Sequence, residues 1–301
     1  MNCNTLKYLK CSWSYDFYFP SRYFQDFGMQ TLKKAVIPAA GLGTRLQPIT
    51  KGKPKEMLPI GAHPMIFYAV REAALAGLEH LYIVISKRKF SLQSYLESNK
   101  WEADLQREEK GNSVSIPRIT LIDQPAPLGS GDAVYRTKEM IGQEPFALMM
   151  PDFLLLGSSP ALSQMLPLYE RFRTDIVGVL ALGAEEAEGF GNVGIFQPTR
   201  LEKDVVEVYD ISKKLKTPLM PEDGKTTYKT VGRSLLGPHF FSYLERVRPL
   251  KAAWDDAPAL RALCMEKKVI GRILKGTGFD VGNPIGYQAA KEKYSPSYIP
   301  S

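Results

Sequence analysis

The chain has 301 residues, of which 44% are hydrophobic and 24% charged, and its formal net charge is +7 at pH 7. A soluble chain of this size and composition can bury the core of one large α/β domain or of two smaller ones, and we favour one domain. The basic residues are scattered, no recognised nucleic-acid motif occurs, and no run of about 18 apolar residues is present to span a membrane, so neither partner is expected.

The first 28 residues differ from the rest of the chain. They are rich in aromatic residues but contain neither the apolar core nor the small-residue cleavage site of a secretory signal. Met29 stands just ahead of the first predicted strand. We therefore expect Met29 to be the natural start, and residues 1–28 to be a start-site artefact or a disordered arm.

A glycine-rich loop follows the first apolar strand, within the stretch KKAVIPAAGLGTRLQPITKGKPKEMLP at residues 33–59. Gly41 and Gly43 can adopt backbone angles that are closed to other residues, so backbone amides at the end of the strand can turn toward an anion. Arg45 adds a planar fork and Lys55 a compact point charge, and one of each suits a chain of phosphates. The order of these residues predicts a polyphosphate site.

Beyond the loop, strand-like and helix-like patterns alternate. A proline at the start, a glycine at the end and apolar residues on one face predict a helix over residues 64–77. The remaining patterns predict strands at 81–85, 119–122 and 146–150 and a helix at 130–141. This alternation predicts an α/β fold with a parallel sheet, helices on both faces, and ligands at the carboxyl ends of the strands.

Two familiar phosphate motifs do not fit the loop. The dinucleotide fingerprint needs a third glycine where Leu46 stands, and the P-loop needs Gly-Lys-Ser/Thr where this chain has Gly-Thr-Arg at 43–45. The stretch instead resembles the start of bacterial-type UTP-glucose-1-phosphate uridylyltransferases, sugar nucleotidyltransferases with the pattern AGxGTRxxPxT followed by PKEMLP. The matching residues are Ala40, Gly41, Leu42, Gly43, Thr44, Arg45, Pro48, Thr50 and residues 54–59.

This resemblance runs from about residue 33 to residue 294 and implies a fold and a reaction. The fold is a Rossmann-like mixed, mostly parallel sheet of the nucleotide-diphospho-sugar transferase type. It forms one domain at 29–301, with a nucleotide-binding half at 29–152 and a sugar-binding half at 153–295. In the reaction, the phosphate of glucose 1-phosphate attacks the α-phosphorus of UTP in line, giving UDP-glucose and pyrophosphate.

The protein needs no nucleophile or general base for this chemistry, because a phosphate oxygen is already ionised at neutral pH. Its work is alignment and charge neutralisation, and the resemblance assigns this work to Mg²⁺, Arg45, Lys55 and Lys213. His63, His80 and His239 occupy no motif, so we expect core or surface positions for them.

The nucleobase is assigned to a segment near residue 130. In the resembling family, a glutamine matching Gln124 faces the pyrimidine, and glycines matching Gly129 and Gly131 let the base and ribose lie against the backbone. By itself this segment is equally consistent with a helix N-terminal loop that uses glycine for turning. Its neighbours, the loop at 40–45 and Lys55, favour a nucleotide site.

Two distant aspartates are candidates for a metal site. A carboxylate at the end of a buried strand usually caps the next element or binds a cation. The segment Met150-Pro151-Asp152 resembles the family's LPD motif, and residues 280–287 resemble its D-x-G-N-x-x-G-Y motif. The resemblance implies that Asp152 and Asp280 hold one Mg²⁺ that bridges the substrate phosphates.

The match is weaker in the sugar-binding half. Gly191 lies in a segment like the one that covers the hexose, and Gly232 lies in a segment like the one that returns to the sheet. Between them the family carries Glu-Lys-Pro, in which the glutamate holds sugar hydroxyls and the lysine holds the sugar's phosphate. Here Lys213 can take the lysine's place, but Ser212 replaces the glutamate and Lys214 the proline.

The change to Ser212 bears on sugar recognition. A serine offers a shorter reach and a neutral hydrogen bond worth about 1 kcal/mol, against about 1.5 to 3 for a carboxylate, unless a register slip brings Asp210 into the pocket. A second departure lies at 254–259, where only the acidic pair of the family's GDEIQLTDA pattern remains. Two alternatives stay open: the same reaction with dTTP, CTP or another sugar, and a catalytically impaired relative that binds nucleotide as a regulatory or assembly partner.

Three cysteines, an odd number without CxxC or metal-ligand spacing, favour reduced thiols in a cytoplasm. The expected partners are UTP and a sugar 1-phosphate. The family's habit of symmetric assembly adds an expected homo-oligomer, a dimer or a tetramer.

Overall fold

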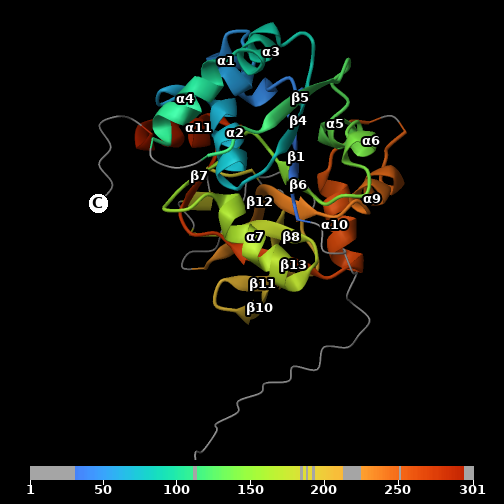
Figure 1. Cartoon of the computed structure of the whole chain (residues 1–301). Helices are drawn as coiled ribbons and strands as arrows, with labels where there is room; N and C mark the ends of the chain where they lie inside the picture. The colour runs from blue at the N-terminus through green and yellow to red at the C-terminus, as the bar shows by residue number, and fades with distance from the viewer. Residues whose placement is uncertain are drawn as a thin grey trace, which may run out of the picture.

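The computed structural model describes residues 31–110, 114–183, 186–187, 189–191, 194–212, 225–250 and 252–294. Within these residues a single large sheet runs through the middle of the molecule, and helices cover both of its faces (Figure 1). The predicted leader at 1–28 and Lys213 lie outside the described residues.

The strands are β1 (Lys34–Pro38), β2 (Pro59–Ile60), β3 (His63–Pro64), β4 (His80–Ile85), β5 (Arg118–Asp123), β6 (Phe146–Met149), β7 (Phe153–Leu156), β8 (Ile176–Leu182), β9 (Ile195–Phe196), β10 (Thr199–Glu202), β11 (Val205–Val208), β12 (Thr227–Leu236), β13 (Val269–Ile273) and β14 (Thr277–Asp280). The helices are α1 (Gln47–Thr50), α2 (Met65–Leu75), α3 (Phe90–Glu97), α4 (Lys100–Glu108), α5 (Ser130–Tyr135), α6 (Lys138–Ile141), α7 (Ala161–Phe172), α9 (Phe240–Arg246), α10 (Ala257–Glu266) and α11 (Pro284–Lys293), with 3₁₀ turns η1 (Thr44–Leu46) and η2 (Lys55–Met57).

The sheet has the strand order β10-β11-β13-β8-β12-β6-β1-β4-β5, and β9 pairs with β12. The part of the sheet formed by β6, β1, β4 and β5 is parallel, because β1 pairs in parallel with β4 and β6, and β4 pairs in parallel with β5. β12 then runs antiparallel to both β6 and β8, while β8 and β13 are parallel again. The predicted mixed α/β sheet is confirmed, and β12 separates the parallel strands β6, β1, β4 and β5 from the strands that begin with β8.

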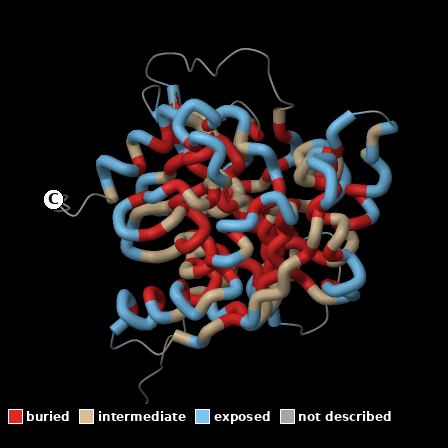
Figure 2. The backbone as a smooth tube through the Cα atoms, turned by 90° about the horizontal axis from the view of Figure 1, so that it is seen from above, coloured by how far each residue is buried: buried red, intermediate tan, exposed pale blue. Residues whose placement is uncertain are grey.

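Two apolar cores lie on the two faces of the sheet. One core packs α2 and α7 against the sheet, and the other packs α5, α9 and α10 (Figure 1). In Figure 2, buried positions accordingly lie in the middle of the molecule, and exposed positions lie on its outer turns. A sheet covered on both faces leaves its strand ends as the accessible edge for a ligand.

The predicted helix at 130–141 is wrong in its length. The chain forms two short helices there, α5 and α6, with a break at residues 136–137. The Thr137 hydroxyl donates a 2.7 Å hydrogen bond to the Val134 carbonyl, which is the kind of local side-chain bond that competes with helix continuation. The helix predicted at 64–77 is confirmed as α2, with Pro64 before its first residue and Gly77 after its end.

A third, smaller core joins the first loop to the C-terminal part of the chain. It contains Leu46 of η1, Leu154 of β7 and Phe279 of β14. β7 and β14 form a two-stranded antiparallel ribbon in which Asp280 lies opposite Phe153. This packing brings the residues around Arg45 close to Asp152 and Asp280, which are 128 positions apart in the sequence.

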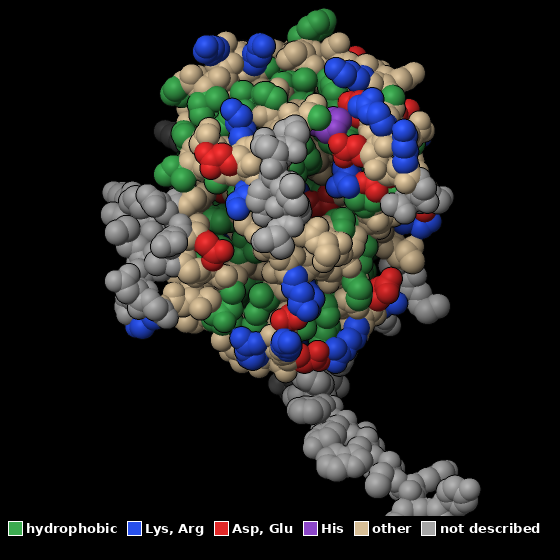
Figure 3. All heavy atoms as spheres, turned by 90° about the vertical axis from the view of Figure 1, so that its left-hand side faces the viewer, with side chains coloured by type: hydrophobic (Ala, Val, Ile, Leu, Met, Phe, Trp, Pro, Cys, Tyr) green, Lys and Arg blue, Asp and Glu red, His purple; other side chains and the backbone are tan. Residues whose placement is uncertain are grey.

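On the side that Figure 3 presents, the surface has no large patch of one sign of charge. Lysine and arginine side chains alternate there with aspartate and glutamate. Among the described residues, no helix combines the length and the apolar character needed to cross a membrane.

Candidate active site

A cavity of about 440 Å³ opens where β1, β5 and β6 end. The loop after β1, the start of η2, the β5–α5 loop and the β6–β7 turn form most of its wall. Its lining residues are Pro38, Ala40, Gly41, Leu42, Gly43, Thr44, Arg45, Lys55, Glu56, Gln124, Pro127, Gly129, Ser130, Ala133, Met150, Pro151, Asp152, Ala253, Asp255 and Gly282. The ligand edge predicted for a parallel sheet therefore holds a cavity.

Gly43 and Gly41 of the first loop differ in what surrounds them and in why a glycine stands there. Gly43 has φ +66°, a left-handed conformation that favours glycine, and an added Cβ would lie 3.1 Å from the Lys55 Cβ. Gly43 thus lets the Lys55 side chain pass into the cavity. An added Cβ at Gly41 would meet nothing within 4 Å, so the loop is open at that position.

Lys55 and Asp152 form an ion pair at the cavity wall, with 2.6 Å between Lys55 Nζ and Asp152 Oδ2. Burial opposes ionisation of the Asp152 carboxyl, but the charge and hydrogen bond of Lys55 outweigh burial and hold the pKa of Asp152 below its usual value. The same interactions outweigh burial at Lys55 and raise the pKa of its ammonium. Both groups are therefore charged at neutral pH.

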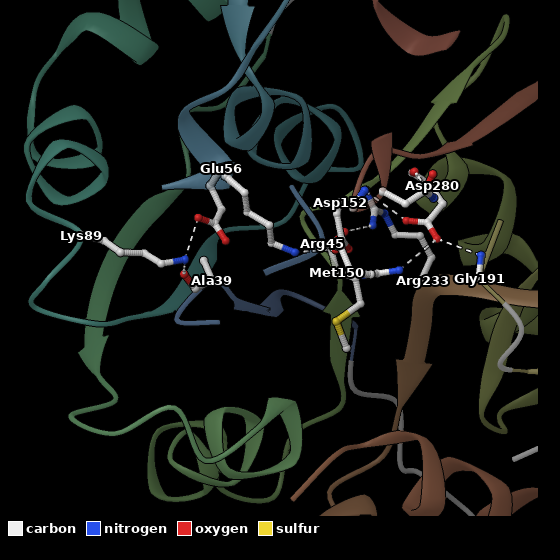
Figure 4. Close-up of polar contacts among 12 residues, drawn as sticks. Ala39, Arg45, Glu56, Lys89, Met150, Asp152, Gly191, Arg233 and Asp280 are labelled. Carbon is white, nitrogen blue, oxygen red and sulfur yellow. Dashed lines mark hydrogen bonds and ion pairs between the residues drawn. The ribbon is translucent and has the colours of Figure 1, made fainter. Parts of the chain in front are cut away.

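Asp280 lies beside Asp152, as Figure 4 shows, because Val281 N–H donates a 2.8 Å hydrogen bond to the Asp152 carbonyl. The Asp280 carboxylate accepts hydrogen bonds of 3.1 Å from the amides of Gly191 and Gly282. Burial and the neighbouring charge of Asp152 raise the pKa of Asp280. A site in which one carboxylate disfavours ionisation of the next is electrostatically prepared for a cation.

Arg45 completes the charged group at the mouth of the cavity. Its Nη1 lies 4.0 Å from Asp280 Oδ2, and its side chain is 58% exposed. An added Cβ on Gly282 would lie 3.0 Å from Arg45 Nη2, so Gly282 leaves room for the guanidinium. The structure thus brings together four of the predicted residues, Arg45, Lys55, Asp152 and Asp280.

The predicted Mg²⁺ site requires side chains that can act as ligands for the ion. Among the residues that the structure describes, no group of three or more His, Cys, Asp or Glu side chains is arranged to hold a metal. Asp152 and Asp280 offer two hard carboxylates, which fits Mg²⁺, an ion that keeps several waters and commonly takes substrate phosphate oxygens as ligands. The two carboxylates therefore fit a magnesium ion whose remaining ligands are waters and substrate phosphate oxygens.

Gln124 is buried at the back of the cavity with 2% exposure. Its amide nitrogen donates hydrogen bonds of 3.0 Å to the Gly129 carbonyl and 2.7 Å to Asp132 Oδ2. Both partners are acceptors, so they define the orientation of the amide. The two N–H groups are occupied, and the carbonyl oxygen is the group that Gln124 can offer to a ligand.

The glycines at 129 and 131 are explained by packing of the chain itself. An added Cβ at either position would clash with the Trp254 backbone, and Gly131 N–H donates a 2.7 Å hydrogen bond to the Trp254 carbonyl. Asp256 then bonds to the Ser130 hydroxyl. Residues 254–256, part of the segment at 254–259 that departs from the family pattern, therefore pack against residues 129–131 of the loop before α5, the base loop.

Sequence reasoning missed Lys89, which follows the end of β4. The residue is 8% exposed, and its ammonium donates 2.7 Å hydrogen bonds to Glu56 Oε2 and to the Ala39 carbonyl. Burial lowers the pKa of Lys89, and Glu56 opposes the shift. Lys89 ties the glycine-rich loop to η2 (Figure 4), and its place at a strand's carboxyl end was the signal that could have indicated it.

Arg233 supports the turn that carries Asp152. It is fully buried and pairs with Glu72 of α2 through contacts of 2.8 to 3.0 Å. It also donates to the carbonyls of Met150, at 2.7 Å, and Phe153, at 2.9 Å, on both sides of Asp152. An added Cβ at the adjacent Gly232 would lie 2.5 Å from the Met150 Cβ, so glycine is needed for the close approach of β12 to this turn.

The predicted sugar residues are only partly described. The amide of Gly191 contacts Asp280, so the segment ending there covers the acidic pair. The Ser212 hydroxyl accepts a 3.1 Å hydrogen bond from Ile195 N–H, within a pairing of the two segments. Asp210 forms an ion pair with Arg261 of α10, at 2.7 Å, and the considered register slip into the pocket is therefore wrong.

The three histidines make contacts outside the cavity lining. His63 lies between Asp104 and Glu108, His80 bonds to Thr120, and His239 bonds to Asp175. These contacts are structural, in agreement with the expectation from the sequence.

Comparisons with known proteins agree with this geometry. The model of the nucleotidyl transferase family matches residues 34–295. The UTP–glucose-1-phosphate uridylyltransferase YngB of Bacillus subtilis (strain 168) is 34% identical over 274 residues, which cover 87% of this chain and 89% of the relative. The UTP–glucose-1-phosphate uridylyltransferase of Streptococcus pneumoniae is 33% identical over 279 residues, covering 88% of this chain and 90% of the relative.

A solved structure is similar over the same region. The crystal structure of UDP-glucose pyrophosphorylase complexed with UDP-glucose has a TM-score of 0.73 and 32% identity, and the match covers 88% of this chain and 98% of that chain. The chain belongs to the nucleotidyl transferase family. The family predicted from the sequence motifs is thereby confirmed.

Proposed function

We propose that the protein transfers a uridylyl group from UTP to glucose 1-phosphate, giving UDP-glucose and pyrophosphate. The observation that carries this proposal is the meeting of Arg45, Lys55 and Asp152 at one cavity whose inner end is closed by Gln124, with Asp280 next to Asp152. Relatives and a structural neighbour named for this substrate pair support the choice of UTP and glucose.

The chemistry is a single in-line displacement. An ionised oxygen of the sugar 1-phosphate forms a bond to the α-phosphorus of UTP, and the bond between that phosphorus and the α–β bridging oxygen breaks. The electron pair leaves with pyrophosphate, which is stable as an anion, so no proton must be moved by the protein. The side chains act by alignment and by neutralising the phosphate charges.

Arg45 and Lys55 have the positions and charges for this work. Arg45 is largely exposed at the mouth of the cavity, so its guanidinium can turn to grip phosphate oxygens in pairs. Lys55 is held by Asp152 without substrate, and a triphosphate offers it a second anionic partner. Mg²⁺, held by Asp152 and Asp280, would add charge neutralisation on the phosphates.

Gln124 supports uracil over cytosine. Because its two amide N–H groups are bound to Gly129 and Asp132, it presents an acceptor to the base. Uracil and thymine have an N–H at ring position 3, whereas cytosine has a lone pair there, so an acceptor binds the first two and repels the third. We expect UTP or dTTP to be used at least about 100-fold more efficiently than CTP.

We further propose that residues 29–152 bind the nucleotide and residues 153–295 the sugar, with Gly191, Ser212, Lys213 and Gly232 on the sugar side. The cavity lining supports the first assignment, because most of its residues precede residue 153. We propose that the enzyme works in the cytoplasm as a homo-oligomer, a dimer or a tetramer. Light scattering on the full chain measures the oligomeric state.

The deciding experiment is pyrophosphate release by the purified full chain with Mg²⁺, UTP and glucose 1-phosphate, with UDP-glucose identified by mass spectrometry. Parallel reactions contain dTTP or CTP, a panel of other sugar 1-phosphates, or no added metal. Turnover that is fastest with UTP and glucose 1-phosphate is the expected result. Binding of UTP without turnover in any reaction would overturn the proposal and favour the impaired relative.

A further inference from the structure

Asp132 is a buried carboxylate in the first turn of α5, directly behind the base loop in sequence. Only 6% of its surface is exposed. The described residues that line the active-site cavity of about 440 Å³ do not include Asp132, which instead lines a separate cavity of about 1150 Å³. Any influence of Asp132 on a bound nucleotide must therefore act through another residue.

One carboxylate oxygen of Asp132 joins two donors. Asp132 Oδ2 accepts a 2.7 Å hydrogen bond from Gln124 Nε2 and another of 2.7 Å from Arg136 Nε. Arg136 Nη1 also donates a 3.4 Å hydrogen bond to the carbonyl of Asp123, the residue just before Gln124. Hydrogen bonds with a charged partner are stronger than neutral ones. Asp132 and Arg136 therefore hold both the side chain of Gln124 and the backbone that precedes it.

The Gln124 amide has a second anchor in the base loop. Its nitrogen donates a 3.0 Å hydrogen bond to the Gly129 carbonyl, which also accepts a 3.2 Å hydrogen bond from Ala133 N–H of α5. Turning the amide by half a turn would break both of its hydrogen bonds and place its carbonyl oxygen against two acceptors. Both anchors belong to the protein, so the amide is oriented before a nucleotide binds.

We propose that Asp132 is the positioning residue that sets the base preference of the site, acting through the amide of Gln124. With its N–H groups held, Gln124 offers a carbonyl oxygen, which matches the N–H at ring position 3 of uracil. Without Asp132 one anchor remains, and the amide can turn to offer an N–H to the lone pair at the same position of cytosine. The inference rests on the proposed function, because it names the residue that selects UTP for that reaction.

The test compares Asp132→Leu with Glu139→Leu in steady-state kinetics of the full chain, with glucose 1-phosphate and either UTP or CTP. Leucine cannot accept the hydrogen bond from Gln124. In Asp132→Leu, kcat/KM should fall for UTP and rise for CTP, so that their ratio decreases by at least about tenfold. Glu139 is an exposed carboxylate that lines the same separate cavity, and Glu139→Leu should leave the ratio unchanged.

Asp132→Asn tests whether the acceptor itself is what matters. Asparagine keeps the shape and can offer its carbonyl oxygen to both donors, so the ratio should stay within about threefold of wild type. An unchanged ratio in Asp132→Leu, or equal losses for UTP and CTP, would reduce Asp132 to a structural residue and overturn the inference. A ratio that falls as far in Asp132→Asn as in Asp132→Leu would overturn the proposed action through the orientation of Gln124.

A second measurement covers a variant that does not fold and a protein that does not turn over. Nuclear magnetic resonance of the wild-type chain with isotope-labelled glutamine reports the Gln124 side-chain amide, whose signals are assigned by their loss in Gln124→Met. Both amide protons should exchange slowly with water, with and without UTP, because both are hydrogen-bonded inside the protein. Fast exchange of either proton would contradict the two anchors.

Calorimetric affinities for UTP and CTP replace the kinetic ratio if no turnover occurs. Slow exchange together with a preference for UTP that Asp132→Leu removes would then support Asp132 while the proposed function failed. Turnover with UTP and glucose 1-phosphate that keeps its full preference over CTP in Asp132→Leu would support the proposed function and overturn the inference.

Discussion

The sheet has two sides that assemble their part of the site differently. On the parallel side, from β6 to β5, Arg45, Gln124 and Asp152 each follow a strand, and the strands' common direction brings their ends to one edge. On the side of β12, Asp280 comes from the two-stranded β7–β14 ribbon, which does not share this common direction. There, long-range contacts between separate segments have to bring each residue into place.

The two sides of the sheet differ in how far they depend on single contacts. The parallel side holds its site through the backbone ladder itself, reinforced by Lys89 between two loops. The β12 side depends on the two-stranded β7–β14 ribbon, and Arg233 of β12 links it to the parallel side by holding the turn that carries Asp152. Substitutions on the β12 side should therefore lower the activity or the stability strongly, although these positions are far in sequence from the first loop.

The largest expected effect is on activity, from Asp280→Asn. The change keeps the shape and removes one of the two carboxylates, so we expect kcat for pyrophosphate release to fall by about 1000-fold or more. Asp280→Ala should abolish Mg²⁺-dependent turnover. Asp210→Asn is the control, because Asp210 is paired with Arg261 outside the cavity, and it should stay within about twofold of wild type. An active Asp280→Asn would show that the parallel side suffices for catalysis.

The next largest effect is on stability, from Arg233→Met. Removing Arg233 leaves Glu72 as a buried and uncompensated charge, so we expect the free energy of unfolding to fall by about 3 to 5 kcal/mol. Arg246→Met breaks the exposed pair with Glu266 and should cost less than about 1 kcal/mol. Urea denaturation of both variants measures the difference. Equal losses of unfolding free energy would mean that the Arg233–Glu72 pair does not hold the β12 side together.

A third change probes the parallel side. Lys55→Ala should lower kcat/KM for UTP by about 100-fold, because the phosphates lose a fixed cation. Lys53, an exposed lysine two residues before Lys55, is the control, and Lys53→Ala should change kcat/KM less than about threefold. Initial rates over a range of UTP concentrations measure both. Similar rates for wild type and Lys55→Ala would remove Lys55 from the phosphate site.

The sequence could predict the parallel side well, for a physical reason. The residues from 40 to 59 lie in one contiguous stretch, and Gly43 and Lys55 contact each other within it. Alternating patterns predicted the strands, and their common direction then predicted the ligand edge. Asp152 and Asp280 were predicted from the family motifs, and the structure shows them together because β7 pairs with β14.

Other features could not be predicted, because they depend on packing between distant positions. Arg233 and Glu72 are 161 positions apart, and nothing local to either indicates the pair. At the break between α5 and α6, the Thr137 hydroxyl donates to the Val134 carbonyl, and a pattern of apolar residues does not indicate this contact.

Asp256 contacts the parallel side of the sheet from far along the chain, because its partner Ser130 lies 126 positions earlier, and its substitution should have a small effect. Burial raises the pKa of the Asp256 carboxyl, and the hydrogen bond from Ser130 opposes the shift. The folded state therefore binds the proton more tightly than the unfolded state does. Stability from this group is greatest below its unfolded pKa, about 4, and decreases as pH rises toward the folded pKa.

Asp256→Asn is neutral at every pH and can still accept the Ser130 hydrogen bond. We expect the variant to be more stable than wild type at pH 7, by at most about 1 kcal/mol, and the gain to vanish near pH 4. Urea denaturation at several pH values between 4 and 7 measures it. A wild type that is more stable at pH 7 would mean that the ionised carboxylate stabilises the contact with Ser130. The residues at 254–256 would then hold the base loop by charge as well as by packing.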